Sequence, residues 1–231
     1  MVFLIPGFIR VKKYPGALSE QNKMGGVIMI TRKPSKLPKI INQDAVIKIL
    51  EQINRKCWTG TRNYAIVMML YRAGLRVQEL CNLTLPDINF DTGLIYVQQG
   101  KGNKDRYVPM DKDNIKALKK WLEIRPEECD YLFCTRKNGQ LDQRYVRDLC
   151  YRLSEKAGIY IQDGKEKKPV SPHKFRHTCF SELLREGTCN IREIQQLAGH
   201  KSLDTTMIYT HVIMDEVQKK IIARKPLSAR K

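Results

Sequence analysis

A single block of alternating hydrophobicity inside an otherwise helical sequence constrains the fold of this chain more than any other feature. Its apolar residues recur at every second position, and turn residues interrupt it twice. Alternation of this kind is typical of half-buried strands joined by short turns. The block therefore predicts a three-stranded antiparallel meander, with strands at 87–91, 94–99 and 106–110 and turns at 92–93 and 100–105.

Helical periodicity holds before this block. Asn42 is placed to cap a helix whose apolar positions recur at helical spacing as far as Ile53. The next run, 65–70, is almost entirely apolar, which indicates a central helix that Gly74 ends. A short helix is expected around 77–83.

Helical periodicity resumes after the block. Ser171 is placed to cap one helix and Pro172 to fill its first position, while Asn190 begins the next helix and Gly199 ends it. Asp204 is placed to cap one more. The expected helices lie at 113–124, 143–158, 171–187 and 190–199, with a basic loop at 163–169. The predicted fold class is α+β, mainly helical, with one small three-stranded antiparallel sheet.

The chain divides by composition into two parts. Residues 1–34 are rich in glycine and proline, carry six basic residues and one acidic residue, and sustain no period. We expect them to form an extended or partly disordered basic arm. Residues 35–231 are expected to form one compact domain with a C-terminal helical tail.

The charge balance indicates a polyanionic partner. The 231 residues include 42 Lys and Arg against 24 Asp and Glu, a formal net charge of +18. Nucleic acid is the first candidate. An anionic membrane surface is the competitor, but no basic amphipathic helix concentrates the charge and no run approaches the roughly 20 apolar residues of a membrane span.

The cysteines indicate free thiols. There are seven of them, an odd number, and none has the Cys-x-x-Cys spacing of a zinc site. Reduced thiols in a cytosolic protein follow from this pattern. No carboxylate cluster suited to Mg²⁺ is apparent either.

Basic residues near the start of the helix at 171 have two interpretations. His173 and Arg176 are three residues apart and share a face, and His177 lies close to it. The first turns of a helix favour bound anions, so these side chains can form part of a phosphate site. A solvated basic face is the alternative.

Four other residues are candidates for the same chemistry. Arg76 follows a helix break, with Glu79 three residues on as its partner, although a surface ion pair would show the same spacing. Lys101 lies on the hairpin turn, where it could protonate a leaving oxygen or only be solvated. His200 precedes Tyr209 by nine residues, and Tyr209 could equally be a packed core residue.

Read together, these segments resemble the tyrosine recombinase (phage integrase) family of the Xer type. The matching stretches are "AGLRVQEL", "GKGNKDR", "HKFRHTCFSELL" and "LAGHKSLDTTMIYTHV", in order, within a resemblance that covers about residues 36–224. The resemblance implies a catalytic domain of that family. It also implies a catalytic set of Arg76, Lys101, His173, Arg176, His200 and Tyr209, with His177 as a supporting neighbour.

The family chemistry is a reversible cut in DNA. The resemblance implies that Tyr209 attacks a phosphodiester, forms a 3′-phosphotyrosine bond and releases a 5′-hydroxyl, so that bond energy is stored without ATP. Arg76 and Arg176 would hold the non-bridging oxygens and His200 would add a donor. Lys101 is the candidate general acid, and His173 the candidate for assisting proton loss. No cofactor and no metal are expected.

Partners follow from the same resemblance. We expect double-stranded DNA, and self-association on DNA from dimer to tetramer through the apolar stripe of the tail, with intramolecular packing of that stripe as the alternative. Full-length members carry an N-terminal core-binding domain, and only the short arm stands in its place here. The chain is therefore expected to be either a fragment or a minimal recombinase. The stripe consists of Val212, Ile213, Val217 and Ile221.

Three functions remain open on the sequence. The first is a site-specific recombinase acting in integration, excision or resolution, with a cytoplasmic, nucleoid-associated location and a prokaryotic, viral or mobile-element origin. The second is a type IB topoisomerase-like activity. The third is a non-catalytic DNA-binding regulator, because residues 190–212 also resemble a helix-turn-helix.

Overall fold

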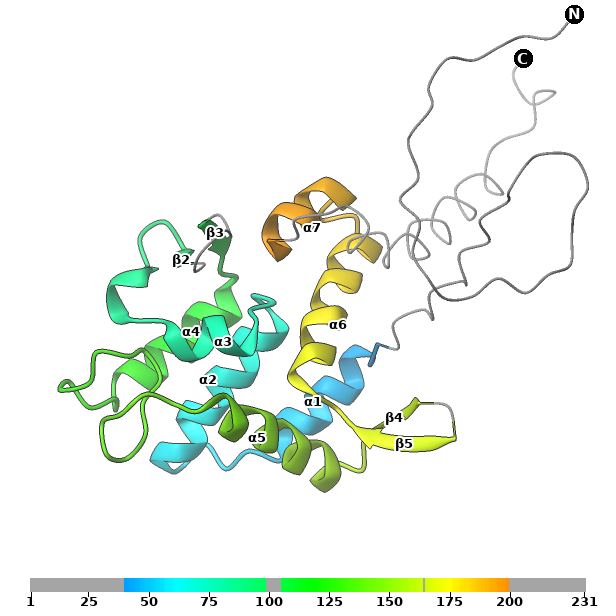
Figure 1. Ribbon diagram of the computed structural model, residues 1–231, viewed down its shortest axis with the longest axis horizontal. Helices are drawn as coiled ribbons and strands as arrows, with labels where there is room; N and C mark the ends of the chain where they lie inside the picture. The colour runs from blue at the N-terminus through cyan, green and yellow to red at the C-terminus, as the bar shows by residue number, and fades with distance from the viewer. Residues whose placement is uncertain (1–39, 99–104, 164, 200–231) are drawn as a thin grey trace, which may run out of the picture. The chain divides into compact units, whose positions relative to one another are not determined.

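The computed structural model describes residues 40–98, 105–163 and 165–199 (Figure 1). All of them belong to one compact unit, Lys36–Lys231, which is separate from the unit Met1–Ser35. The expected N-terminal arm, the cap at Asp204 and the apolar stripe of the tail lie outside the described residues.

The described helices and strands follow the order that the hydrophobic pattern predicts, apart from one additional pair of strands. The helices are α1 (Gln43–Glu51), α2 (Trp58–Tyr71), α3 (Val77–Asn82), α4 (Lys112–Leu122), α5 (Gln143–Lys156), α6 (Pro172–Arg185) and α7 (Ile191–Ala198), with a 3-10 turn, η1, at Leu85–Asp87. The strands are β1 (Ile88–Asn89), β2 (Leu94–Val97), β3 (Arg106–Pro109), β4 (Tyr160–Asp163) and β5 (Glu166–Pro169). The predicted fold class, mainly helical with a small antiparallel sheet, is confirmed.

Helix α2 is the centre of the core. Its residues 65–70 are almost completely buried, and the helix packs against α4 and α6. A helix that is apolar on all sides has to be covered on all sides, which explains its central place. Trp121 of α4 completes the contact, because its fully buried ring meets that of Trp58 edge-on at 5.1 Å.

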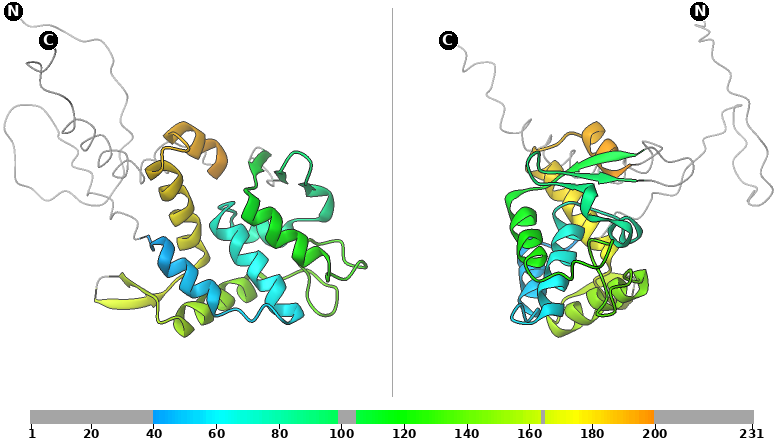
Figure 2. Two further views of the ribbon diagram at one scale, coloured as in Figure 1. Left: turned by 180° about the vertical axis from the view of Figure 1, so that it is seen from behind. Right: turned by 90° about the vertical axis from the view of Figure 1, so that its left-hand side faces the viewer.

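The predicted meander is present. Strand β1 pairs with β2, and β2 pairs with β3, both antiparallel. Val97 and Arg106 are the last paired residues before the hairpin turn, and Val108 is buried on the same side of β3 as Arg106. In the right-hand view of Figure 2 this sheet lies next to α7, which contacts β3.

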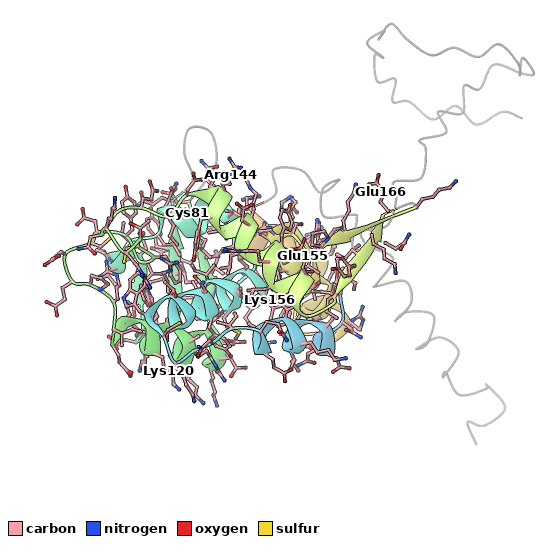
Figure 3. The ribbon with its side chains drawn as sticks, turned by 90° about the horizontal axis from the view of Figure 1, so that it is seen from below. Cys81, Lys120, Arg144, Glu155, Lys156 and Glu166 are labelled. Carbon is pink, nitrogen blue, oxygen red and sulfur yellow. The ribbon has the colours of Figure 1, made fainter. Side chains whose placement is uncertain are left out.

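A second sheet forms where the sequence indicated only a loop. Residues 163–169, expected to be a basic loop, belong mostly to a two-stranded hairpin of β4 and β5. The hairpin projects from the body beside α5, and Figure 3 shows Glu166 at its exposed end. Its strands face solvent over most of their length, so no alternation marked them. Its base is held by the buried Ser154, whose hydroxyl accepts from the Val170 N–H at 2.8 Å.

Most of the predicted helix ends are confirmed. The Asn42 side chain accepts from the Ala45 N–H at 2.9 Å, and the Asn190 side chain caps α7 in the same way. Gly199 ends α7 with φ of 59°. Ser171 does occupy the N-cap position of α6, but its side chain makes no capping hydrogen bond. The prediction of a serine cap was therefore right in position and wrong in mechanism.

A buried arginine organises the loop after α4. Arg125 is 8% exposed and donates hydrogen bonds to several backbone carbonyls between residues 126 and 132. These hydrogen bonds tie the loop together, and the Leu132 carbonyl also accepts from the Trp121 Nε1–H at 2.8 Å. No helix of the described ranges is long and apolar enough to cross a membrane.

Candidate active site

Arg76 stands at the corner between α2 and α3. Gly74 makes the corner possible, since its φ of +62° belongs to the left-handed region that side chains other than glycine avoid. The Arg76 Nη1 donates to Oε1 of Glu79 at 2.6 Å, and the Arg76 backbone N–H donates to Oε2 at 2.8 Å. Glu79 is 9% exposed, so the predicted partnership is largely buried and is not a simple surface ion pair.

Arg176 comes from the second turn of α6 and is 4% exposed. Its Nη1 donates to the Gly74 carbonyl, and its Nη2 donates to the Ala198 carbonyl at 2.6 Å. One side chain thus ties the corner after α2 to the end of α7. The guanidinium also lies over the Phe180 ring, 4.7 Å from its centroid.

The two predicted arginines meet at the end of α7. Arg76 Nη2 donates to the Gly199 carbonyl at 3.2 Å, one residue beyond the carbonyl that Arg176 holds. Residues more than 120 positions apart in the chain are therefore brought to one place. His200 is the next residue after Gly199 in the sequence.

A third arginine, which the sequence analysis did not single out, belongs to this cluster. Arg106 donates from Nη1 and Nη2 to the two carboxylate oxygens of Glu79, at 2.9 and 2.8 Å. Its Nε donates to the Leu197 carbonyl at 2.7 Å. The sequence did contain a sign of this role. Residues 106 and 108 lie on the same side of strand β3, and a charged residue on the buried side needs a partner.

Glu79 is the carboxylate that these arginines share. Its Oε2 also lies 4.0 Å from Arg176 Nη1. Burial by itself would raise the pKa of Glu79, but the hydrogen bonds and charge of Arg106, with the Arg76 N–H and the charge of Arg176, outweigh it and lower the pKa to about 2. The carboxylate is therefore ionised, and the cluster of three guanidiniums keeps a net positive charge.

His173 lies in the first turn of α6, close to this charge. Partial burial, followed by the charges of Arg176, Arg76 and Lys174, lowers its pKa below the ordinary value of 6.5. The imidazole is consequently neutral at pH 7 and able to accept a proton. Its ring lies 5.5 Å from that of His177, centroid to centroid.

The structure therefore brings together three members of the predicted set and leaves the other three undescribed. Arg76 and Arg176 converge at the end of α7, and His173 lies near enough for their charges to lower its pKa, so positive charge and donors there suit an anion. The Arg76 side chain is 31% exposed and reaches solvent, whereas that of Arg176 is 5% exposed. Lys101, His200 and Tyr209 lie outside the described residues.

No metal site accompanies this cluster in the part of the chain that the structure describes. Within those ranges no group of three or more His, Cys, Asp or Glu side chains could hold a metal ion.

Comparison with known proteins assigns the chain to a family. The model of the phage integrase family matches residues 39–216, most of the chain. The chain belongs to this family, as the sequence motifs predicted.

The proteins similar to this chain include tyrosine recombinases of the Xer type. The chain is 40% identical over 189 residues to the tyrosine recombinase XerA of Thermococcus kodakarensis, covering 80% of this chain and 62% of that protein. It is 35% identical to the tyrosine recombinase XerC of Oceanobacillus iheyensis, covering 85% of this chain and 63% of that protein. The chain thus spans a little under two thirds of the length of these relatives.

Solved structures agree with this assignment. A crystal structure of XerA recombinase superposes with a TM-score of 0.69 at 35% identity, covering 83% of this chain and 68% of that chain. XerH site-specific recombinase, bound to its palindromic difH substrate in a post-cleavage complex, superposes with a TM-score of 0.66 at 28% identity. That match covers 81% of this chain and 54% of the XerH chain.

Proposed function

We propose that this chain is the catalytic part of a site-specific DNA recombinase that cuts and rejoins DNA through a covalent 3′-phosphotyrosine intermediate. The observation that carries the proposal is the convergence of Arg76 and Arg176 on the last carbonyls of α7, directly before His200. Two guanidiniums at one point supply the donors and the charge that a phosphodiester under attack requires. The family assignment and the DNA-bound XerH relative support the same activity.

In this mechanism the hydroxyl oxygen of Tyr209 attacks the scissile phosphorus. A bond forms between that oxygen and phosphorus, and the bond from phosphorus to the 5′ oxygen breaks. Arg76, Arg176 and His200 stabilise the negative charge on the non-bridging oxygens in the transition state. One donor placed this way is worth about 10²- to 10³-fold in rate in acyl transfer, so two arginines can account for a large part of the catalysis.

Two proton transfers complete the cleavage. The tyrosine proton has to leave, because a free phenol has a pKa of about 10. His173 accepts it in our proposal, because its lowered pKa leaves the imidazole unprotonated at neutral pH. Lys101 gives a proton to the departing 5′ oxygen, which becomes a hydroxyl. The reverse steps, with a 5′-hydroxyl from another strand, rejoin the DNA without metal or ATP.

The net charge of +18 supports duplex DNA as the partner. We also propose a cytoplasmic location in association with the nucleoid, because the DNA partner lies there.

We further propose that copies of the chain assemble on DNA through the C-terminal tail. A cavity of about 380 Å³ between the end of α2, β3, α6 and α7 supports this, since apolar side chains and three carboxylates line it, together with Arg72, which is paired with Asp111. The tail carries an apolar stripe and basic residues at 219, 220, 224 and 225, which complement that lining. The lining includes Phe180, Leu183, Leu197, Asp111, Glu182 and Glu186. Loss of DNA-dependent oligomers in Leu183→Lys, measured by sedimentation velocity, would support the assignment, and unchanged oligomers would contradict it.

The activity is tested with nicked suicide duplexes of randomised sequence. In such a duplex, a nick close to the cleavage point makes the released fragment with the 5′-hydroxyl very short. This fragment diffuses away, so the strand cannot be rejoined and the protein stays covalently bound to the DNA. We expect an SDS-resistant adduct with wild-type protein and none with Tyr209→Phe, which lacks only the attacking oxygen. Sequencing of the trapped DNA then identifies the preferred site.

The alternatives give different outcomes in the same assays. Tight duplex binding without any adduct would favour a regulator that has lost catalysis. An adduct accompanied by plasmid relaxation, but without products joined between two copies of the selected site, would favour topoisomerase-like activity. Joined products would support recombination.

A further inference from the structure

Arg106 lies where three elements of the candidate site meet. It is the first residue of β3, and its side chain is 9% exposed. Two of its nitrogens bind both carboxylate oxygens of Glu79 in α3, and the third binds the Leu197 carbonyl in α7. A planar guanidinium can donate to the Glu79 carboxylate and to the Leu197 carbonyl at once, and a lysine ammonium cannot do so with the same geometry.

Through Glu79, Arg106 also acts on the two arginines proposed to bind phosphate. The carboxylate accepts from the side chain and backbone of Arg76 and lies 4.0 Å from Arg176. A carboxylate held by two parallel hydrogen bonds cannot rotate freely. The bidentate pair with Arg106 therefore sets the direction in which Glu79 presents its oxygens to Arg76.

Arg106 also acts together with Arg76 and Arg176 at the C-terminal end of α7. The final carbonyls of α7 have no partners within the helix, as at every helix C-terminus. Here three consecutive carbonyls accept from three different arginines: Leu197 from Arg106, Ala198 from Arg176 and Gly199 from Arg76. The end of α7 is thus held by both arginines proposed to bind phosphate. Arg106 holds the first of the three carbonyls, that of Leu197.

We propose that Arg106 is a positioning residue for DNA cleavage, which aligns Arg76 and Arg176 through Glu79 and holds the end of α7 against them. All three donor nitrogens of Arg106 bind Glu79 or Leu197, so its role in this proposal is to hold those two groups in place. The inference rests on the proposed function and names a further residue of the same site.

The catalytic test uses single-turnover adduct formation at saturating concentrations of a duplex selected by wild-type protein. We expect Arg106→Met to slow adduct formation about 100-fold, the scale of a misplacement of about 1 Å, and to change DNA affinity less than about threefold. Arg106→Lys should recover about tenfold, because it restores the charge but not the paired hydrogen bonds. A rate for Arg106→Met within threefold of wild type would overturn the inference.

A substrate change separates positioning from loss of folded protein. A methylphosphonate at the scissile position replaces one charged non-bridging oxygen by a methyl group, so the placement of the two arginines matters less. The defect of Arg106→Met should then shrink below about tenfold. An equal defect on both substrates would contradict a role through Arg76 and Arg176. Arg125→Met is the matched control, since it removes a similarly buried arginine whose side chain donates to backbone carbonyls of its own loop.

A second measurement does not depend on catalysis. Hydrogen–deuterium exchange of free protein should be at least tenfold faster in the peptide that ends α7 when Arg106 is Met, and unchanged there when Arg125 is Met. Unchanged exchange at the end of α7 would overturn the inference even if no DNA were cut. A different outcome is that wild-type protein forms no DNA adduct while exchange at the end of α7 is still faster in Arg106→Met. That result would count against the proposed function and would leave the structural role of Arg106 intact.

Discussion

The shared carboxylate predicts a large and pH-dependent loss of stability in Glu79→Gln. Glutamine keeps the shape of the side chain but removes the charge that three guanidiniums share. A pKa lowered from 4.5 to about 2 corresponds to about 3 kcal/mol of folding free energy at pH 7. Against a total stability of about 5–15 kcal/mol, this loss is easy to measure.

The sign of the pH dependence follows from the direction of the pKa. Because the folded pKa lies below the unfolded one, the stabilisation is complete above about pH 4.5 and is lost as the pH falls towards 2. The difference between wild type and Glu79→Gln should therefore fall from about 3 kcal/mol at pH 7 to below about 2 kcal/mol at pH 3.

Urea unfolding followed by tryptophan fluorescence at several pH values measures this difference. Glu166→Gln is the control, since its carboxylate is 73% exposed and its ion pair with Lys168 should contribute less than about 1 kcal/mol. A difference for Glu79→Gln below about 0.5 kcal/mol at pH 7, or one that stays constant between pH 6 and pH 3, would refute the reasoning.

Three further predictions concern the rest of the fold. Gly74→Ala should cost about 3 kcal/mol in urea unfolding, because φ is +62° and the new Cβ would lie 2.9 Å from a buried aromatic ring. Gly187→Ala, with φ of +72° and nothing within 4 Å, should cost only about 1 kcal/mol, and equal losses would contradict the steric argument. Cys57 should be alkylated by iodoacetamide before Cys150 at pH 7.5. Cys57 is exposed, and hydrogen bonds from Thr59 and the Gly60 N–H lower its pKa, whereas burial raises the pKa of Cys150. Peptide mass spectrometry measures the order, and earlier alkylation of Cys150 would contradict the prediction. Arg125→Met should lower stability by about 3 kcal/mol in the same unfolding assay, because it removes the side-chain hydrogen bonds that hold this loop together, and a loss below 1 kcal/mol would show that the loop does not need them.

Local features of the fold were readable because their causes are local. The spacing of apolar residues predicted the helices and the three-stranded meander, and short side chains predicted the caps at Asn42 and Asn190. The β4–β5 hairpin was missed because its strands are largely exposed and carry no alternation. At Ser171 the position followed from sequence, but whether the hydroxyl bonds to the helix depends on its surroundings.

The same division applies to the candidate site. By itself the sequence determined the family, the residues that match its motifs and the Arg76–Glu79 pair, since an N-cap residue and the residue three positions on meet in a capping box. Only the tertiary structure decided that Arg106 joins them, because β3, α3 and α7 are far apart in the chain and meet through packing. Only packing, likewise, placed the last carbonyls of α7 within reach of three arginines. A linear pattern records which side chains can carry charge, while the pairing of each charge depends on which groups the core brings together.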